Sequence, residues 1–559
     1  MVSKEMIFAY ALENAISHSG RAQANSVLSK LFMEGLDKKD IKKVMPLIIE
    51  AIDSVNKMTE IQQEKEFSSL QQLVKKSEYK EKEGLKEMPD AVQGKVVMRF
   101  EPSPTGPLHI GHCLVLCLNH LYKKKYNGKL ILRISDTNPE STDKEAYKGI
   151  QEDAEWITDK NIDEIIYQSD NMKTYYKYAE RIIKMDGAYV CNCKSEHFKS
   201  YVDLGRACPC RHKSLRKNLQ DWKKMFKEYK EGQAVLRIKT ELRAKNPALR
   251  EWPAFRISDT KHPRTGNKYR VWPLMNFAVA IDDIEEGMTH VIRGKDHIVN
   301  TERQKFIYRY LRAKPPVFIH LGKINFEGIH LSTRETAAAI KEGRYSGWDD
   351  IRLPFLKALR KRGIQPGAFL RFAENTGLSE VDKTVPYDEF MVLIYAFNRP
   401  LIESSSRYFF IADPVKIKIK NAPKLDVELH LHPQDKERGK RKFKTSEEFY
   451  ISKQDYEQLK EGEVYRMMGL LNFEKKGKEF IFHSQEHDSK IDVKFLHWLP
   501  SSKNIKAKVL MLDGKYLEGL AEPDVSDLKE GTIIQFERFA FCKLIKKSKK
   551  EMEFWFTQK

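Results

Sequence analysis

The spacing of apolar residues changes along the chain and predicts segments of different structure. In the first part, apolar residues recur at helical spacing, and a helix is expected over Ile41–Val55. From about residue 94 to 335, short apolar runs alternate with helical patterns, which is typical of a doubly wound, Rossmann-like parallel sheet. From about 405 the period becomes two, as in 415–420 and 425–431, which indicates short strands closing into all-β barrels.

These changes predict six segments in a multidomain α/β plus all-β protein. A charged linker over 75–86 separates a small helical domain from the rest. The predicted segments are an N-terminal helical domain (1–93), a first α/β half (94–187), an insertion (188–260), a second α/β half (261–340), a helical segment (341–403) and a β-barrel domain (404–559).

Composition adds a polyanionic partner to this picture. Of the 559 residues, 99 are Lys or Arg and 79 are Asp or Glu, so the formal net charge is +20. A membrane surface is the rival explanation for such a charge. The longest apolar runs, around 271–281 and 391–397, are too short to cross a bilayer, and the N-terminus lacks a signal-peptide pattern. We therefore expect a soluble, cytoplasmic protein.

The seven cysteines do not form a secreted disulfide pattern, and four of them cluster. Cys191 and Cys193 are separated by 14 residues from Cys208 and Cys210, so two close pairs could supply four thiolates to one tetrahedral zinc. His212 is an alternative ligand. The other interpretation is four reduced thiols without a metal.

The most informative stretch runs from a short apolar strand at 95–100 through a Pro- and Gly-rich turn into a helix around 114–121. Such a turn offers backbone N–H groups and a positive helix end to a phosphate. His109 and His112 share one face at the helix start, and Gly111 leaves room for a planar base. The alternative is a pair of surface histidines beside an ordinary helix.

This stretch resembles the His-Ile-Gly-His signature of class I aminoacyl-tRNA synthetases, and its Arg-Phe-x-Pro-Ser-Pro-Thr-Gly lead-in resembles the glutamyl branch. The segment 328–334 resembles the second signature, Lys-Met-Ser-Lys-Ser, with His330 and Thr333 in place of the lysines. Archaeal-type enzymes commonly have a Leu-Ser-Thr form there. The segment 432–441 is similar to one in archaeal and eukaryotic glutamyl and glutaminyl enzymes. The resemblance covers about 95–559.

The resemblance implies two sets of residues for the nucleotide. It implies catalytic roles for His109, His112, Ser332, Thr333 and Arg334. It implies an ATP site, with Mg²⁺ accompanying this co-substrate, that consists of Thr105, His109, Gly111, His112, Asp296 and Leu331.

A glutamate site is implied at Arg99, Ser103, Asp136, Met275 and Arg293. Arg293 corresponds to the residue that binds the γ-carboxylate, and a structural ion pair with Asp282 or Asp283 is its alternative role. Ser135 stands where the family carries an acidic residue for the substrate ammonium, which Asp136 or another group would replace. Met275 occupies a position often held by a tyrosine.

As a whole, the chain resembles archaeal-type glutamyl-tRNA synthetases. Segment 188–260 would then bind the acceptor end with a structural Zn²⁺, 341–403 would contact the tRNA stem, and 404–559 would read the anticodon. The implied partners are tRNA(Glu), ATP and L-glutamate, with a monomeric enzyme and no membrane. Charging of tRNA(Gln) and a protein partner for the helical domain stay open. A small-molecule nucleotidylyltransferase, a catalytically inactive RNA-binding paralogue and the glutaminyl enzyme are the alternatives.

Overall fold

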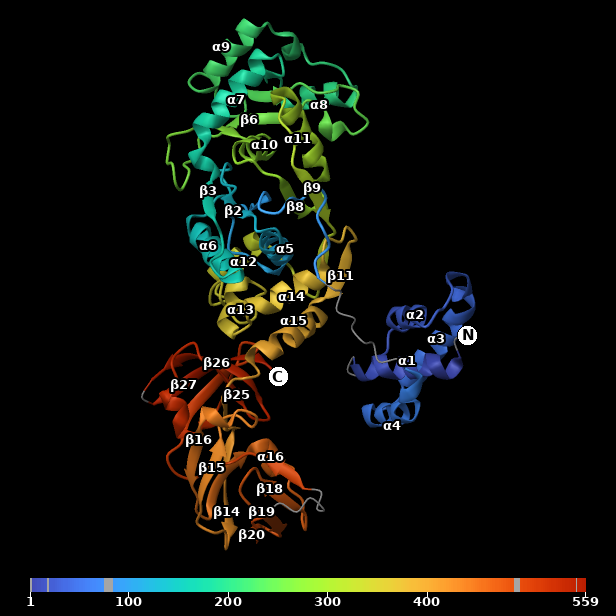
Figure 1. Cartoon of the computed structure of the whole chain (residues 1–559), viewed down its shortest axis with the longest axis vertical. Helices are drawn as coiled ribbons and strands as arrows, with labels where there is room; N and C mark the ends of the chain where they lie inside the picture. Colours follow the sequence, from blue (N-terminus) through green and yellow to red (C-terminus); the bar gives the residue numbers. More distant parts are fainter. Residues whose placement is uncertain (1–2, 18–19, 75–83, 487–492, 549) are drawn as a thin grey trace. The chain divides into compact units, whose positions relative to one another are not determined.

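The computed structural model describes residues 3–17, 20–74, 84–486, 493–548 and 550–559. The chain forms two compact units, Met1–Glu83 and Gly84–Lys559 (Figure 1). The first unit thus ends ten residues before the predicted boundary at 93. Most of the predicted charged linker, residues 75–83, lies outside the described residues.

The first unit is helical in its described part, with α1 (Lys4–Ser17), α2 (Ala24–Met33), α3 (Ile41–Val55) and α4 (Glu60–Leu70). Helix α3 spans the residues that the apolar spacing predicts. Its buried residues Ile48, Ile52 and Val55 follow the helical repeat and pack in one core with Leu12 of α1 and Leu31 of α2.

A parallel sheet opens the second unit. Strands β1 (Val97–Phe100), β2 (Lys129–Ile134) and β3 (Glu164–Tyr167) pair in the order β1-β2-β3, connected by α5 (Ile110–Tyr126) and α6 (Lys144–Thr158). A second parallel pair, β8 (His290–Gly294) and β9 (Val317–Leu321), is joined by α11 (Ile298–Leu311). Three hydrogen bonds between Val97 and Thr289 place the start of β8 beside β1. The predicted alternation of strands and helices is present here.

An antiparallel sheet lies between these two parallel parts in the chain, in the order β4-β5-β6-β7. Its core includes Trp222, Phe255 and Trp272. The sheet extends past the predicted end of the insertion at 260, because its fourth strand lies at 271–273. Its elements and flanking helices are α7 (Met172–Lys184), β4 (Ala188–Cys191), α8 (Ser195–Asp203), α9 (Leu215–Met225), β5 (Val235–Ile238), β6 (Pro253–Ile257), β7 (Val271–Pro273) and α10 (Met275–Glu285).

A mostly helical segment follows, as its periodicity predicts. It contains α12 (Thr333–Lys341), α13 (Leu356–Arg362), α14 (Pro366–Thr376) and α15 (Tyr387–Ile402), with a parallel pair of short strands, β10 (Ile324–Glu327) and β11 (Lys383–Pro386). Helix α14 shares the core of the parallel sheet through Phe369 and Ala373.

The C-terminal part is sheet-rich, with two seven-stranded sheets in the orders β12-β25-β26-β27-β23-β24-β13 and β21-β18-β19-β20-β14-β17-β22. Among the described strands neither order closes on itself, so a closed barrel is not confirmed. A separate hairpin joins β15 to β16. The strands are β12 (Arg407–Tyr408), β13 (Phe410–Ala412), β14 (Pro414–Lys420), β15 (Asp426–His430), β16 (Lys440–Lys444), β17 (Glu448–Ser452), β18 (Val464–Met467), β19 (Asn472–Lys476), β20 (Glu479–Ser484), β21 (Lys494–Leu496), β22 (Leu499–Pro500), β23 (Ile505–Leu510), β24 (Tyr516–Ala521), β25 (Ile533–Phe536), β26 (Ala540–Lys547) and β27 (Glu551–Gln558).

Strand β27 connects the C-terminal sheets to the helical segment. Arg362 of α13, only 2% exposed, donates to the Thr557 carbonyl (3.2 Å) and to the Tyr395 hydroxyl. Asn398 of α15 donates to the Gln558 side chain (2.7 Å). Arg362 therefore lies in a buried contact between α13, α15 and β27.

No helix in the described ranges combines the length and apolarity needed to cross a membrane.

Candidate active site and metal centre

A cavity of about 700 Å³ opens where β1 and β8 end. Its lining comes from the chain after β1, the start of α5, the chain after β8 and the segment 321–331. Residues of both predicted signatures therefore meet at one cavity, at the carboxyl ends of parallel strands, where α/β proteins bind ligands. Thr105, Asp296 and Leu331 of the predicted ATP site are in this lining.

His109 and His112 also line the cavity, with ring centroids 4.0 Å apart. His109 Nδ1 accepts a hydrogen bond from the Gly111 N–H (3.0 Å), and His112 Nδ1 accepts one from the His109 N–H (3.3 Å), which caps α5. Burial lowers the pKa of His109 to about 4 and that of His112 to about 3. Both rings are therefore neutral at pH 7. Because each Nδ1 accepts, each ring carries its proton on Nε2 and offers a donor.

The requirement for glycine at 111 comes from this pair. A Cβ there would lie 2.8 Å from His109 Cε1 and 3.4 Å from Leu331 Cδ1. Any larger residue would push the ring of His109 out of its capping position. The small side chain thus serves the packing of the histidine, in addition to the room for a base that the sequence predicts.

The second signature segment packs against the first. Thr333 Oγ1 lies 3.5 Å from Thr105 Oγ1, and Ser332 caps α12 by accepting from the Glu335 N–H (3.2 Å). Leu331 and His330 line the cavity, whereas Ser332, Thr333 and the exposed Arg334 are outside its lining. Among the described residues, Lys323 is the lysine that lines the cavity, and the sequence analysis did not predict it.

Two buried arginines, Arg99 and Arg293, also line the cavity. Arg293 donates to Thr301 Oγ1 and to Gln304 Oε1 (2.9 Å), and its guanidinium lies 4.9 Å from the Phe318 ring centroid. Burial and the nearby charge of Arg99 lower its pKa to about 10, so it stays a cation at pH 7.

The alternative role for Arg293, an ion pair with Asp282 or Asp283, is wrong. Asp282 accepts from the Tyr175 hydroxyl (2.7 Å) and the Gln168 amide (2.8 Å), and Asp283 accepts from Arg133 (2.8 Å). Within the described residues, no carboxylate lies within ion-pair distance of Arg293. Its guanidinium is therefore available to an anionic ligand.

Ser103 joins Arg99 and Arg293 in the lining, but Asp136 and Met275 do not. Asp136 is fully buried, and its two oxygens accept from the Ser169 N–H (2.7 Å), the Ser169 hydroxyl (2.8 Å) and the Tyr147 hydroxyl (2.7 Å). Met275 is the first residue of α10 and is half-buried. The structure thus brings three of the five predicted glutamate-site residues to the cavity.

Glu101 also lines the cavity, beside Arg99, and the sequence analysis did not predict it. It follows β1 directly, its side chain is 7% exposed, and it lies 3.3 Å from both Arg99 and Arg133. An acidic residue at the end of a parallel strand, two positions after an arginine, was the available signal.

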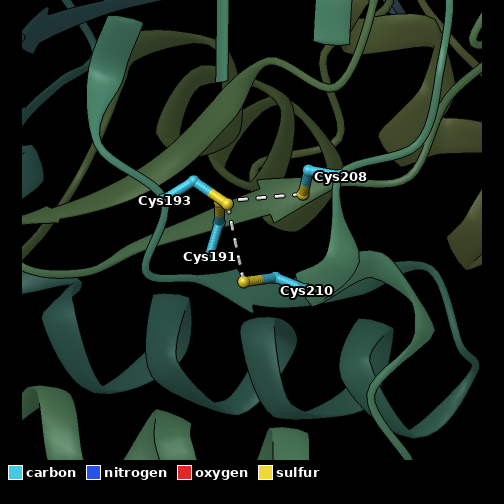
Figure 2. Close-up of side chains that lie close together, drawn as sticks. All are labelled: Cys191, Cys193, Cys208 and Cys210. Carbon is cyan, nitrogen blue, oxygen red and sulfur yellow. Dashed lines mark hydrogen bonds between the residues drawn. The ribbon is translucent and has the colours of Figure 1, made fainter. Parts of the chain in front are cut away.

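The four predicted metal ligands come together (Figure 2), and none of them lines this cavity. Cys191 Sγ lies 3.9 Å from Cys208 Sγ, Cys193 Sγ lies 3.8 Å from Cys210 Sγ, and all four sulfurs lie within 4.8 Å of one another. A tetrahedral zinc with Zn–S bonds of about 2.3 Å requires S···S distances of about 3.8 Å. The thiols fit zinc, and His212 is not part of the group.

Comparison with known proteins agrees with this arrangement. Residues 95–399 match the family described as tRNA synthetases class I (E and Q), catalytic domain. The chain belongs to the class I tRNA synthetases of the E and Q type. Residues 405–493 and 495–545 match two anti-codon binding domains of the same class, so the sheet-rich part of this synthetase corresponds to those domains.

Relatives match over their full length. A glutamate–tRNA ligase of Methanothermobacter marburgensis is 40% identical over 100% of both chains. The glutamate–tRNA ligase of Methanocaldococcus jannaschii is 42% identical, covering 97% of this synthetase and 98% of the relative. That of Pyrococcus furiosus is also 42% identical, covering 98% of each. The resemblance to archaeal-type enzymes is thereby confirmed.

Proposed function

We propose that this synthetase is a glutamate–tRNA ligase, which activates glutamate with ATP and transfers it to the 3′ end of tRNA(Glu). Identity of about 40% over whole chains to relatives of that name supports the reaction. The choice of glutamate as the amino acid rests on Arg293. It is a buried cation at the cavity, and its contacts are a hydroxyl, an amide and an aromatic ring.

Glutamate would bind at the arginine end of the cavity. The planar fork of Arg293 suits the γ-carboxylate, because a buried guanidinium facing an amide would keep an uncompensated charge. Arg99 and Ser103 complete this end. Asp136 and Met275 would act only indirectly, since neither lines the cavity. Glutamine is disfavoured for the same electrostatic reason.

ATP would bind at the other end, over Thr105, Gly111, Asp296 and Leu331. The N-terminus of α5 and the Nε2–H groups of His109 and His112 would face the phosphates, with Mg²⁺ accompanying the nucleotide. The α-carboxylate of glutamate attacks the α-phosphate, and pyrophosphate leaves. Catalysis rests on positioning and on donors aimed at the charge that develops.

The second signature segment would stabilise the leaving pyrophosphate. Ser332, Thr333 and Arg334 form the start of α12, beside Thr105. Lys323 supplies a lysine charge at the cavity. A movement of α12 of the kind seen in lid segments would bring Arg334 to the phosphates.

The remaining parts would bind tRNA. The region 188–260 would hold the acceptor end, with its four cysteines around a structural zinc that fixes the fold there. The helices of 341–403 would contact the stem, and the C-terminal sheets would read the anticodon. The helical unit would serve tRNA or a protein partner.

Aminoacylation of purified tRNA tests the function. The synthetase should attach radiolabelled glutamate to tRNA(Glu) and should not attach glutamine; ATP–pyrophosphate exchange should require glutamate and tRNA. Exchange without any tRNA effect would favour a small-molecule nucleotidylyltransferase. Binding of tRNA without exchange would indicate an inactive paralogue, and glutamine charging would indicate the glutaminyl enzyme. Including tRNA(Gln) shows whether it is a second substrate.

A further inference from the structure

We propose that Glu101 binds the α-ammonium group of the amino-acid substrate and helps to select an amino acid over a plain dicarboxylate. This assignment rests on the proposed function. Glu101 and Asp296 are the carboxylates in the described lining of the cavity. The side chain of Asp296 is 73% exposed, whereas that of Glu101 is 7% exposed and lies at the end that holds the arginines.

The oxygens of Glu101 retain capacity for another donor. Its Oε2 lies 3.3 Å from both Arg99 Nη2 and Arg133 Nη1, and its Oε1 accepts from Gln168 Nε2 at 3.2 Å. A carboxylate has about four acceptor positions, and charge-assisted N–H···O bonds are normally about 2.7–2.9 Å. These three contacts are longer than this, so a substrate ammonium can bind without displacing a strong partner.

The charges around Glu101 also favour a cation. Arg133 contacts Glu101, Asp283 and Glu286, and Arg99 contacts Glu101 and Asp283. Within this ion-paired set the three carboxylates exceed the two guanidinium groups by one, and the additional charge of Arg293, which also acts on Glu101, is the one that a substrate carboxylate would balance. Because the set is buried, an ammonium group at Glu101 would balance its excess negative charge where water does not.

A relay of hydrogen bonds fixes the direction of Glu101. Ser135 donates to Gln168 Oε1 (2.8 Å), which turns the Gln168 amide nitrogen toward Glu101 and Asp282. Ser135 at the end of β2 thus orients the carboxylate at the end of β1. This gives a role to the serine that stands where the resembled family carries an acidic residue for the substrate ammonium.

The test compares Glu101→Gln with Glu286→Gln in tRNA-dependent ATP–pyrophosphate exchange. Both variants remove one carboxylate from Arg133, but Glu286 is outside the cavity lining. We expect Glu101→Gln to raise the KM for glutamate about 10- to 100-fold, the loss of one charge-assisted hydrogen bond, with a KM for ATP within about threefold of wild type. Glu286→Gln removes one charge of the same ion-paired set but no group that faces the cavity, so it should raise the KM for glutamate clearly less than Glu101→Gln and leave the KM for ATP within about threefold of wild type.

Glutarate, which has both carboxylates of glutamate but no ammonium, separates binding from scaffolding. Wild type should bind glutamate more tightly than glutarate, and Glu101→Gln should abolish this preference without weakening glutarate inhibition. Equal rises of KM in Glu101→Gln and Glu286→Gln, or an unchanged preference, would overturn the assignment. If Glu101→Gln does not fold, Glu101→Asp keeps the charge but withdraws it, and should raise the KM for glutamate alone. Absence of glutamate charging by wild type would instead refute the proposed function.

Discussion

At the scale of single residues, the buried arginines differ in what neutralises them. Arg133 contacts three carboxylates, and Arg441 of β16 contacts Glu522 and Glu537. Arg293 instead contacts the hydroxyl of Thr301 and the amide of Gln304. Burial of a cation without a carboxylate is unfavourable. An anionic ligand that pairs with Arg293 removes this unfavourable free energy and therefore binds more tightly.

Replacement of Arg293 should therefore change the choice between amino acids. We expect Arg293→Ala to lower kcat/KM for glutamate by about 10²-fold or more and to reduce the preference over glutamine, since polar mismatches discriminate by up to ~10⁴–10⁵. The measurement is the ratio of kcat/KM for the two amino acids in a folded variant. Arg303→Ala, which removes a guanidinium outside the cavity lining, is the control. An unchanged ratio would place the selector elsewhere.

The histidine pair predicts a pH dependence of stability. In the unfolded chain a histidine gains its proton near pH 6.5, whereas burial holds the pKa values of His109 and His112 at about 4 and about 3. The unfolded state therefore binds more protons as the pH falls from about 6.5 to 4, and the free energy of unfolding decreases over that interval.

Urea unfolding between pH 4 and 7 measures this dependence. His112→Asn should show a shallower fall of the unfolding free energy than wild type, because one of the two buried rings no longer titrates. His483→Asn, at an exposed position of β20, should keep the wild-type slope. Identical slopes in all three proteins would show that the histidine pair is not buried as described.

At the scale of elements, the local spacing of apolar residues predicted individual helices better than it predicted how strands pair into sheets. The bounds of α3 agree with the helical spacing of its apolar residues. The apolar run at 271–281 contains a strand and a helix, β7 and α10, which apolar spacing does not separate. Periodicity indicates which face of a strand is buried, but the order of strands in a sheet depends on contacts between distant residues. The predicted closed barrel therefore went beyond what periodicity supports, and among the described strands it is not confirmed.

The candidate site shows the same division. Motif residues around the glycine turn came together because they are neighbours on one turn and one helix. Asp136 was expected at the cavity but does not line it. A residue after a strand can point into the cavity or away from it, and the Asp136 carboxylate instead accepts hydrogen bonds from Ser169 and Tyr147. The sequence did not point to Glu101, because the hydrogen bond that orients its carboxylate comes from Gln168, 67 positions away.

The cysteine cluster predicts one zinc per chain. Purified, never-chelated protein should contain about one equivalent, and Cys208→Ser should lose most of it and lower the melting temperature, because metal binding contributes folding free energy. Cys542→Ser, at a buried thiol of β26 outside the cluster, should keep the metal. Wild-type protein free of zinc, measured by elemental analysis, would contradict the assignment.

At the scale of the whole molecule, the net charge of +20 predicts that phosphate contacts dominate tRNA affinity. With six to ten contacts, affinity for a duplex would fall by roughly 10³ to 10⁵ between about 50 and 200 mM salt, with a smaller slope where RNA is single-stranded. Titration of tRNA(Glu) at several salt concentrations measures the slope. A tRNA with another anticodon should bind more weakly with a similar slope, whereas salt-independent binding would exclude this account.

The position of β27 has a consequence for how the C-terminal sheet folds. In its sheet, β27 alone joins β12-β25-β26 to β23-β24-β13, and it follows all of these strands in the chain. Until β27 pairs, the two half-sheets therefore have unpaired edges, and the same strand also covers Arg362 and Asn398. A chain truncated before residue 551 would leave two open sheet edges, a risk for aggregation, whereas its catalytic region would keep all of its own strands.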